Sequence, residues 1–378
     1  MHIYLPPAQF IPMHLTEISI ENFKNYEKLQ LSDLGQVVCF TGLNGVGKTN
    51  ILDAIHLMCT GKSYFTAQDA SLIAIWQNYF AIRGNVVNFD HNYHLECILI
   101  EGKRKVIRQN EAAFSKISEY YGNYPIVMIA PADLELVNGL SEGRRNWLDA
   151  LISMTDKLYL NNLIQYEKIL KQRNAALRQI NEKPSMQSML GIYNEQLIPL
   201  GENIYKVRLE FMTEFVPLFG KVYGQISHSK ENAKLNYVST LSDQAFQLGL
   251  EQSLRKDIAL GRTNTGIHRD EIGMMINDAS VKKQGSQGQQ KTYLIAIKLA
   301  QYLYLHSKKG FAPILLLDDI CERLDDERLK NLFSWIIGQE MGQIFITDTS
   351  VDRLRQIIDG KFEGIRYYHL QNSSAQLL

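Results

Sequence analysis

The strongest constraint on this chain is the eight-residue segment GLNGVGKT, which runs from Gly42 to Thr49. It fits the pattern G-x-x-x-x-G-K-[ST], in which small residues let backbone N–H groups curl around phosphate oxygens. The apolar residues 36–41 predict a buried strand before it, and apolar residues spaced as on one helix face follow it. A strand, a glycine-rich loop and a helix together predict a phosphate-binding loop for a nucleotide.

The residue types in this loop predict separate tasks. In such loops the lysine, here Lys48, reaches the β- and γ-phosphates, and the hydroxyl of Thr49 ligates Mg²⁺. The following helix directs the positive end of its dipole at the same phosphates. We therefore expect ATP and Mg²⁺ as cofactors. The predicted nucleotide-binding residues here are Gly42, Leu43, Asn44, Gly45, Val46, Gly47, Lys48, Thr49 and Asn50.

A second nucleotide motif lies near the other end of the chain. The apolar residues 314–317 end in the carboxylates of Asp318 and Asp319, which is the Walker B pattern. Because the buried strand carries the first carboxylate to the metal, Asp318 is predicted to hold Mg²⁺ with Thr49. Asp319 is predicted to orient or deprotonate the attacking water. Asp319 and Lys48 are the predicted catalytic residues.

A third motif, GSQGQQ at residues 285–290, opens a predicted helix just before Walker B. A serine hydroxyl, a glycine N–H and a helix N-terminus form a second phosphate clamp. The segment resembles the signature motif of ABC-type ATPases, which closes on a γ-phosphate held by another subunit. That resemblance implies that ATP joins two copies of the chain. The residues expected to contact ATP from the second copy are Ser286, Gln287, Gly288 and Gln289.

Between the motifs, residues 133–222 change to helical periodicity. Two heptad seams flank a turn at residues 181–185, so we predict a short antiparallel coiled-coil-like arm. Pro199 and Gly201 fall inside the second seam and predict a kink or a split. Arg173 occupies a skipped position of the first seam. The seam residues are Leu163, Tyr166, Leu170, Leu177 and Ile180, then Tyr193, Leu197, Leu200, Ile204, Val207 and Phe211.

These patterns predict an α/β fold: an ABC-type P-loop ATPase head, with a mixed sheet and helices, plus an inserted helical lobe that carries the arm. Residues 13–134 and 235–378 are predicted to form the ATPase lobe, with strands and loops over 235–278. Residues 135–234 are the predicted helical lobe. Residues 1–12 are treated as an extension, because a strand pattern starts just after them.

Composition narrows the class of protein. Lys plus Arg and Asp plus Glu each number 40, so a nucleic-acid surface would have to be a local basic patch. No apolar run approaches the roughly 20 residues of a membrane span. The four cysteines lack metal-ligand spacing, which fits a reducing cytoplasm. The candidate DNA-contact residues are Lys103, Arg104, Lys105, Lys168, Lys171, Arg173 and Arg178, with ordinary solvated charge as the alternative.

Seven short motifs, spread over nearly the whole chain, resemble those of the RecF family, relatives of SMC proteins. They are NFKNY at 22–26, GKS at 61–63, PADL at 131–134, RRNWLD at 144–149, QRN at 172–174, GIHRDE at 266–271 and SQGQQ at 286–290. The resemblance implies a cytoplasmic, weak, DNA-dependent ATPase of DNA replication, repair and the SOS response. It also implies an ATP-dependent homodimer that binds duplex DNA near single-strand junctions and helps RecR and RecO load RecA.

The sequence departs from the family at one loop and leaves two other functions open. Residues 322–325 read ERLD where the family has SELD, so a role for Glu322 is in doubt. An ABC transporter ATPase is the first alternative, against which stands the missing switch histidine after Ile346. A non-hydrolysing nucleotide-dependent scaffold is the second, although Lys48 and Asp319 are both present.

Overall fold

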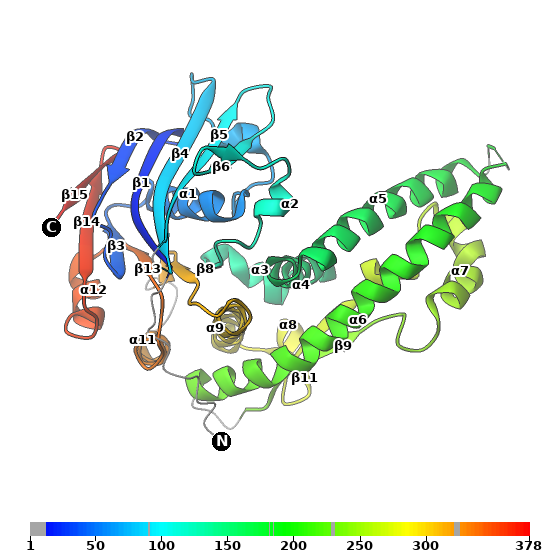
Figure 1. Cartoon of the computed structure of the whole chain (residues 1–378). Helices are drawn as coiled ribbons and strands as arrows, with labels where there is room; N and C mark the ends of the chain where they lie inside the picture. Colours follow the sequence, from blue (N-terminus) through cyan, green and yellow to red (C-terminus); the bar gives the residue numbers. More distant parts are fainter. Residues whose placement is uncertain (1–12, 90, 181, 184, 228–230, 321–325) are drawn as a thin grey trace. The chain divides into compact units, whose positions relative to one another are not determined.

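The computed structural model describes residues 13–89, 91–180, 182–183, 185–227, 231–320 and 326–378 (Figure 1). They divide into two compact units. Unit 1 comprises residues 13–133, 225–227 and 295–378, and unit 2 comprises residues 134–224 and 231–294. Among these residues, none of the helices is both long and apolar enough to span a bilayer.

Unit 1 contains two six-stranded sheets. The first has the order β2-β1-β4-β5-β6-β7, and each neighbouring pair is antiparallel. Its side chains alternate between buried and exposed, as expected where one face covers a core. The strands are β1 (His14–Phe23), β2 (Tyr26–Leu31), β4 (Tyr79–Asn88), β5 (His91–Ile100), β6 (Val106–Gln109) and β7 (Ala112–Ala113).

The second sheet has the order β15-β14-β3-β13-β12-β8 and is parallel except for β15. Its central strands are continuous apolar runs buried along their length, which is typical of a parallel sheet covered on both faces. The strands are β3 (Val37–Thr41), β8 (Ile126–Ile129), β12 (Ile314–Leu317), β13 (Ile344–Asp348), β14 (Ile365–Gln371) and β15 (Ser374–Leu377).

Helix α1 (Lys48–Thr60) packs against strands of both sheets and lies between them in Figure 1. Its side chains are buried almost all round, and one continuous apolar core joins α1 to both sheets. The other helices of unit 1 are η1 (Asp69–Leu72), α2 (Ile117–Tyr120), η2 (Pro131–Asp133), α11 (Asp326–Ile337), α12 (Val351–Ile358) and the second part of α9 (Gln287–Lys309).

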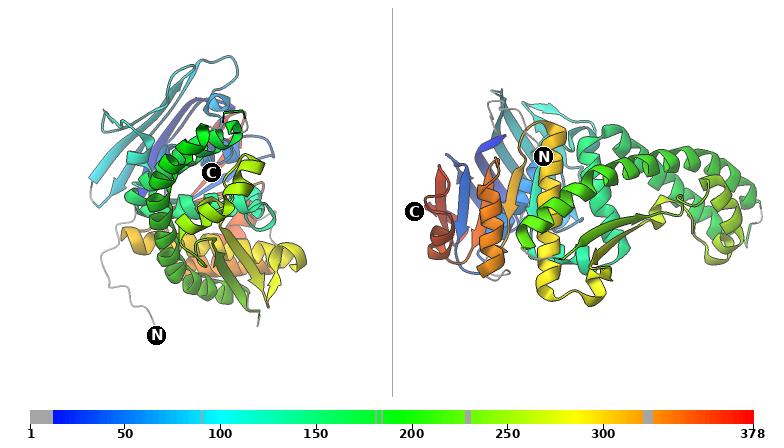
Figure 2. Two further views of the ribbon diagram at one scale, coloured as in Figure 1. Left: turned by 90° about the vertical axis from the view of Figure 1, so that its right-hand side faces the viewer. Right: turned by 90° about the horizontal axis from the view of Figure 1, so that it is seen from below.

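Unit 2 is mainly helical, and α5 and α6 lie side by side as a long hairpin (Figures 1 and 2). The helices are α3 (Leu134–Asn138), α4 (Ser141–Thr155), α5 (Lys157–Gln179), α6 (Met186–Ser227), α7 (Phe246–Leu260), η3 (Ile267–Arg269), α8 (Val281–Gln284) and the start of α9. A small antiparallel sheet has the order β11-β10-β9. Its strands are β9 (Ala233–Val238), β10 (Glu271–Ile276) and β11 (Ala279–Ser280).

Helix α6 is continuous through the positions that were expected to break it. Pro199 lies inside this 42-residue helix, so the predicted split is wrong, while a kink there stays a prediction; Pro217 lies inside the same helix. Gly201 has a packing reason instead, because a Cβ atom there would lie 2.5 Å from a ring carbon of Phe246. The glycine therefore lets α7 approach α6 closely, and the packing of α6 outweighs the helix-breaking preferences.

The boundary between the units differs from the predicted one. Residues 235–278, predicted as strands and loops of the ATPase lobe, lie in unit 2 and include the 15-residue helix α7. The helix buries Phe246 and Leu250 and packs on α5. Its apolar side chains serve this contact within unit 2, where β10 packs on α4 and pairs with β9.

Candidate nucleotide site

The loop between β3 and α1 has the backbone that its glycines predict. Gly42, Gly45 and Gly47 have φ angles of 147°, 81° and 110°, a region that favours glycine. A Cβ atom on Gly42 would lie 2.6 Å from the carbonyl oxygen of Leu370. Helix α1 begins at Lys48, directly after Gly47, so its first N–H groups face the loop. The arrangement is an anion cradle at a helix N-terminus.

The segment NFKNY supports the outer side of this cradle. The side-chain amide of Asn25 donates to the carbonyl oxygen of Val46 at 3.1 Å, and the hydroxyl of Tyr26 donates to that of Gly47 at 3.1 Å. Asn50 in turn donates to the Asn25 side chain at 2.7 Å. These bonds hold the loop by its carbonyl groups, which leaves backbone N–H groups for phosphate oxygens.

The ammonium group of Lys48 lies within the loop. The residue is 4% exposed, and its Nζ donates to the carbonyl oxygens of Gly42 at 2.8 Å and Leu43 at 3.2 Å. A buried ammonium needs partners that compensate for lost hydration, and phosphate oxygens are stronger acceptors than carbonyls. The position therefore suits a cation that receives a polyphosphate.

Thr49 and Asp318, the two residues predicted to hold the metal, lie in contact. The hydroxyl of Thr49 donates to both carboxylate oxygens of Asp318, at 2.9 and 3.1 Å, although the two residues are 269 positions apart. Burial raises the pKa of Asp318, while hydrogen bonds from Thr347 and Thr49 oppose that rise. A hydroxyl and a buried carboxylate are hard oxygen ligands of the kind that Mg²⁺ prefers. The pair fits Mg²⁺, with waters and phosphate oxygens completing the coordination.

Thr347 is a site residue that the sequence motifs did not identify. It lies at the end of β13, donates to Asp318 at 2.9 Å and accepts from the backbone N–H of Asp319 at 2.8 Å. Asp319 has a φ angle of 44°, and this hydrogen bond helps to hold its backbone there. In the sequence, Thr347 follows the apolar residues 344–346, but that pattern does not show that the strand will pair with β12.

The signature segment begins α9 with reciprocal hydrogen bonds. The backbone N–H of Ser286 donates to the Gln289 side chain at 2.8 Å, and the N–H of Gln289 donates to the Ser286 hydroxyl at 3.2 Å. This is a capping box, which fixes the first turn of the helix. The side-chain amide of Gln289 also donates to Glu231 at 2.8 Å. Gln287 and Gly288 lie in that first turn, so the four predicted residues gather in unit 2.

Two further family-like motifs meet around the buried carboxylate of Asp53 in α1. Lys24, from NFKNY, forms an ion pair with Asp53 at 2.6 Å, and the hydroxyl of Ser63, from GKS, donates to it at 2.8 Å. Next along the chain, the Tyr64 hydroxyl donates to Asp133 of PADL, and both accept from Lys298 of α9. The sequence analysis did not identify Asp53 or Lys298.

Buried arginines link other motifs in unit 2. Arg208 of α6 pairs with Asp149 of RRNWLD at 2.8 Å and with Asp270 of GIHRDE at 2.6 Å. Arg173, from QRN, is fully buried and pairs with Asp257 of α7 at 2.9 Å. Arg173 therefore cannot contact DNA from the surface of α5, and its candidacy is wrong.

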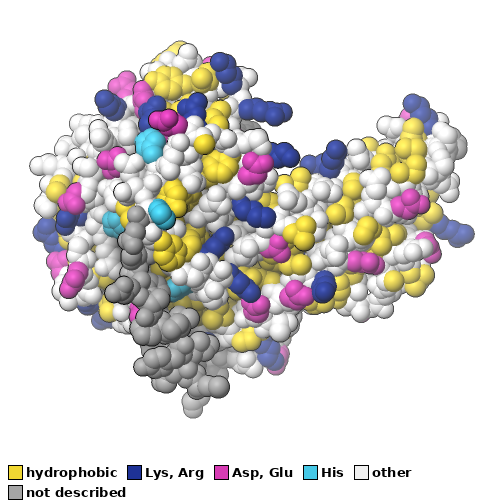
Figure 3. Space-filling view, viewed as in Figure 1, with side chains coloured by type: hydrophobic (Ala, Val, Ile, Leu, Met, Phe, Trp, Pro, Cys, Tyr) yellow, Lys and Arg dark blue, Asp and Glu magenta, His cyan; other side chains and the backbone are white. Residues whose placement is uncertain are grey.

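The remaining basic candidates differ in exposure. Lys105 pairs with Asp69 at 2.6 Å and has a side chain that is only 4% exposed. The exposed candidates are Lys103, Arg104, Lys168, Lys171 and Arg178. Figure 3 shows cationic and anionic side chains interspersed on one face, which agrees with the equal numbers of basic and acidic residues in the sequence. The segment ERLD at 322–325 lies outside the described residues.

Comparison with known proteins places the chain in a family. Residues 13–120 match the model of an AAA ATPase domain. The DNA replication and repair protein RecF of Flavobacterium johnsoniae is 38% identical over 359 residues, covering 95% of this chain and all of that protein. The chain belongs to the RecF family. RecF of Cytophaga hutchinsonii is also 38% identical, over 96% of this chain and 97% of its own length.

Solved structures agree with this RecF assignment. A structure described as the recombination mediator protein RecF-ATP in the RecFOR pathway superposes with a TM-score of 0.89 at 30% identity, covering 99% of this chain and 100% of that one. An Smc head domain from Pyrococcus furiosus, at 15% identity and a TM-score of 0.57, covers 97% of this chain and 96% of its own. The predicted fold, an ABC-type ATPase head with an inserted helical lobe, is confirmed.

Proposed function

We propose that this RecF-family chain binds ATP with Mg²⁺ and hydrolyses it slowly, as an ATP-dependent DNA-binding protein of replication and recombinational repair. The observation that carries the proposal is the meeting of Thr49 with Asp318 beside the glycine loop, within 3.1 Å. Thr49 and Asp318 are far apart in the sequence, and folding brings them together beside the phosphate cradle as a pair that can bind a metal. Membership of the RecF family supplies the DNA-repair context.

Each residue of the cradle has a task in this proposal. Loop N–H groups and the α1 N-terminus bind the phosphates, and Lys48 exchanges its carbonyl partners for β- and γ-phosphate oxygens. Thr49 and Asp318 hold Mg²⁺, which supplies charge neutralisation on the phosphates. Asp319 accepts a proton from the attacking water or orients it, since it adjoins Asp318 and its backbone is held by Thr347.

The signature segment completes the site from a second copy of the chain. Ser286 to Gln289 form a capped helix N-terminus, which is suited to bind a γ-phosphate. In ABC-type ATPases this contact is made between subunits, so ATP binding favours a homodimer and hydrolysis releases it. We propose that the dimer binds duplex and gapped DNA near single-strand junctions in the cytoplasm. There it helps RecA to load, with RecR and RecO as partners.

Two groups of exposed basic residues are proposed to contact DNA phosphates. Lys168, Lys171 and Arg178 lie on the exposed side of α5. Arg262 and Arg269 are exposed near η3, and the pKa of Arg269 is lowered by partial burial and by the neighbouring charges of Arg262 and Arg145. An anion bound beside these like charges would reduce their mutual electrostatic repulsion. Contacts of this kind give salt-sensitive binding with little sequence specificity.

Light scattering and gapped-duplex binding, each with and without ATP, test the proposal on wild type, Lys48→Met and Ser286→Arg. We expect the wild type to dimerise and to bind DNA more tightly with ATP, and both variants to remain monomeric. A wild type that stays monomeric and binds DNA equally without nucleotide would overturn the clamp. Purification with a membrane partner would instead favour the transporter function.

A further inference from the structure

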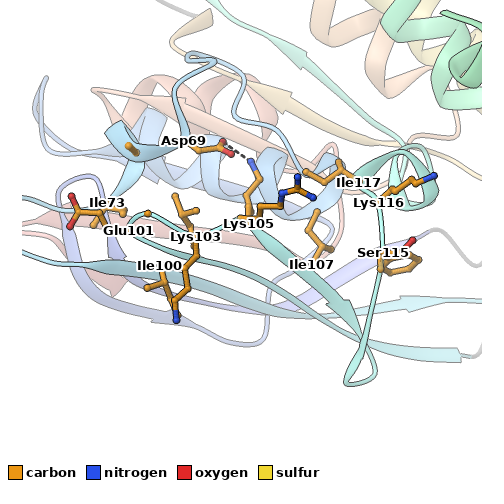
Figure 4. Close-up of a pocket in the computed structure, with 15 residues that line it drawn as sticks. Asp69, Ile73, Ile100, Glu101, Lys103, Lys105, Ile107, Ser115, Lys116 and Ile117 are labelled. Atoms are coloured by element: carbon orange, nitrogen blue, oxygen red, sulfur yellow. Dashed lines mark hydrogen bonds and ion pairs between the residues drawn. The ribbon is translucent and has the colours of Figure 1, made fainter. Parts of the chain in front are cut away.

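A cavity of about 480 Å³ lies in unit 1 at the turn between β5 and β6, distant in sequence from the phosphate loop (Figure 4). Its lining combines charged residues with an aliphatic part that includes Ile73, Leu99, Ile107 and Ile117. The neighbouring Ile100 is 41% exposed. Volumes of this size are typical of ligand pockets. The nucleotide proposal gives this cavity no task.

The rim of the cavity is basic. Lys103, Arg104 and Lys116 are exposed, and among the residues that the structure describes none forms an ion pair with them. Figure 4 shows Lys103 and Lys116 extending outward on different sides of the cavity. Of the two carboxylates on the lining, Asp69 is already paired with Lys105 at 2.6 Å, and Glu101 lies on the turn. The rim therefore carries an excess of positive charge.

A second cavity of about 490 Å³ adjoins the first, and Asp69, Lys105 and Ile117 line both. Its other wall is the segment 61–67, where Phe65 is 38% exposed. We call the two cavities together the groove, and its lining combines apolar side chains with the lysines Lys62, Lys103 and Lys116. That pattern suits an extended segment with a bulky apolar residue rather than a compact ion.

We propose that this groove is a docking site for an acidic peptide segment of a partner protein. One large apolar side chain of the peptide enters the aliphatic cavity, and flanking carboxylates meet Lys103, Arg104 and Lys116. Charge complementarity across the rim steers the peptide, and burial of its apolar side chain supplies most of the affinity. The proposal does not depend on the nucleotide site.

The lining favours a peptide over a nucleic acid. Bases stack on exposed aromatic faces, whereas the apolar part of this lining is mostly isoleucine, with Phe114 as its aromatic member. Glu101 on the turn would also repel the closely spaced phosphates of a nucleic acid. A peptide, in contrast, can place its carboxylates away from Glu101. Contact with DNA at Lys103 and Arg104 is therefore the competing outcome of the test.

The experiment uses fluorescence anisotropy with the full-length protein and a short labelled peptide that carries one phenylalanine flanked by aspartates. We expect saturable binding with a Kd of roughly tens of micromolar, lost when the phenylalanine becomes serine or the aspartates become asparagines. Lys103→Glu/Arg104→Glu should weaken binding by about tenfold or more. Ile100→Ser, at a half-exposed position, should also weaken it.

The matched control is Arg255→Glu/Lys256→Glu, an equal charge reversal at two exposed residues of α7. It should leave peptide affinity within about twofold of wild type. Lys48→Met should also bind the peptide normally, so failure of the nucleotide site is distinguishable. Should the glutamate double variant misfold by circular dichroism, Lys103→Ala/Arg104→Ala is expected to give a smaller loss.

Two outcomes would overturn the proposal. The first is an absence of saturable peptide binding, or equal weakening by the 103/104 and 255/256 charge reversals. The second is normal peptide binding by Lys103→Glu/Arg104→Glu together with weakened binding to a DNA duplex. That result would assign these two residues to DNA contact.

Discussion

The phosphate loop and the signature segment are both helix N-termini, but they are held in different ways. The loop before α1 is held by distant parts of the chain, since Asn25 and Tyr26 bind its carbonyls and Asp318 binds Thr49. The start of α9 is held mostly by its own residues, through the reciprocal bonds of Ser286 and Gln289. The first arrangement is prepared to bind a ligand within one chain, whereas the second is prepared only to present a helix end.

The largest expected effect comes from removing the Lys48 charge, which belongs to the phosphate loop and not to the signature segment. Lys48→Met should weaken ATP binding by about a hundredfold, because hydrogen bonds to charged groups contribute about 1.5–3 kcal/mol. Titration with a fluorescent ATP analogue measures this. Lys28→Met, at an exposed position in β2, is the control and should bind normally. Equal affinity of Lys48→Met and wild type would remove the loop from the nucleotide site.

The next prediction tests whether ATP hydrolysis can be lost in unit 1 while ATP binding is kept. Asp319→Asn should lower ATP turnover by close to a hundredfold, because the water loses its proton acceptor. ATP affinity should remain, so the ATP-bound dimer should accumulate in light scattering. Turnover at the wild-type rate would assign the acceptor elsewhere.

A smaller effect belongs to the signature segment. Ser286→Arg should weaken ATP-dependent dimerisation by about tenfold to a hundredfold, because a bulky cation would occupy the helix end that is proposed to face the second copy. ATP binding by the monomer should be unchanged. Ser286→Thr retains a hydroxyl for the capping box and should dimerise nearly normally. Loss of ATP binding by monomeric Ser286→Arg would contradict the assignment of ATP binding to the phosphate loop and of dimerisation to the signature segment.

The smallest effect is a pH dependence confined to unit 2. Burial lowers the pKa of His268 to about 4, while its ring bonds the Tyr166 hydroxyl at 2.8 Å. Since the unfolded histidine titrates near 6.5, the unfolded state binds more protons between these values. The free energy of unfolding should thus be unaffected above pH 6.5, fall by about 1 kcal/mol per pH unit between pH 6.5 and 4, and fall no further through this group below that.

Hydrogen exchange in α4 and α5, compared at pH 7.5 and pH 5, measures this change. His268→Gln removes the titrating group and should reduce the difference between the two pH values. An unchanged difference in that variant would assign the acid sensitivity of unit 2 to other groups.

The sequence predicted those parts of the molecule whose chemistry is local. The phosphate loop, the Walker B strand and the capped signature helix each depend on residues within one short segment, so residue type and spacing were sufficient. The roles of Thr347 and Asp53 were not predicted, because each is defined by partners from other segments. Nothing near Thr347 in the sequence indicates that Asp318 will lie beside it.

The same reason explains the errors in unit 2. Arg173 looked like an exposed or disruptive charge because its partner Asp257 is 84 positions away. Pro199 and Gly201 predicted a kink or a split, but α6 is not split, and Gly201 gives Phe246 room to pack. Helix α7 was missed because its apolar face is satisfied by α5, a contact that local periodicity did not reveal.

The position of β3 has a consequence for synthesis on the ribosome. The strand that leads into the phosphate loop pairs on one side with β13 and on the other with β14, and Thr41 donates to the carbonyl oxygen of Tyr368, 327 positions later. A nascent chain therefore makes its phosphate loop early but obtains both flanking strands late. During translation the loop lacks its sheet, and Asp318 is also absent. Unit 1 must accordingly wait for β13 and β14, while most of unit 2 can already pack, so the phosphate loop gains its sheet only after the residues of unit 2 have been made.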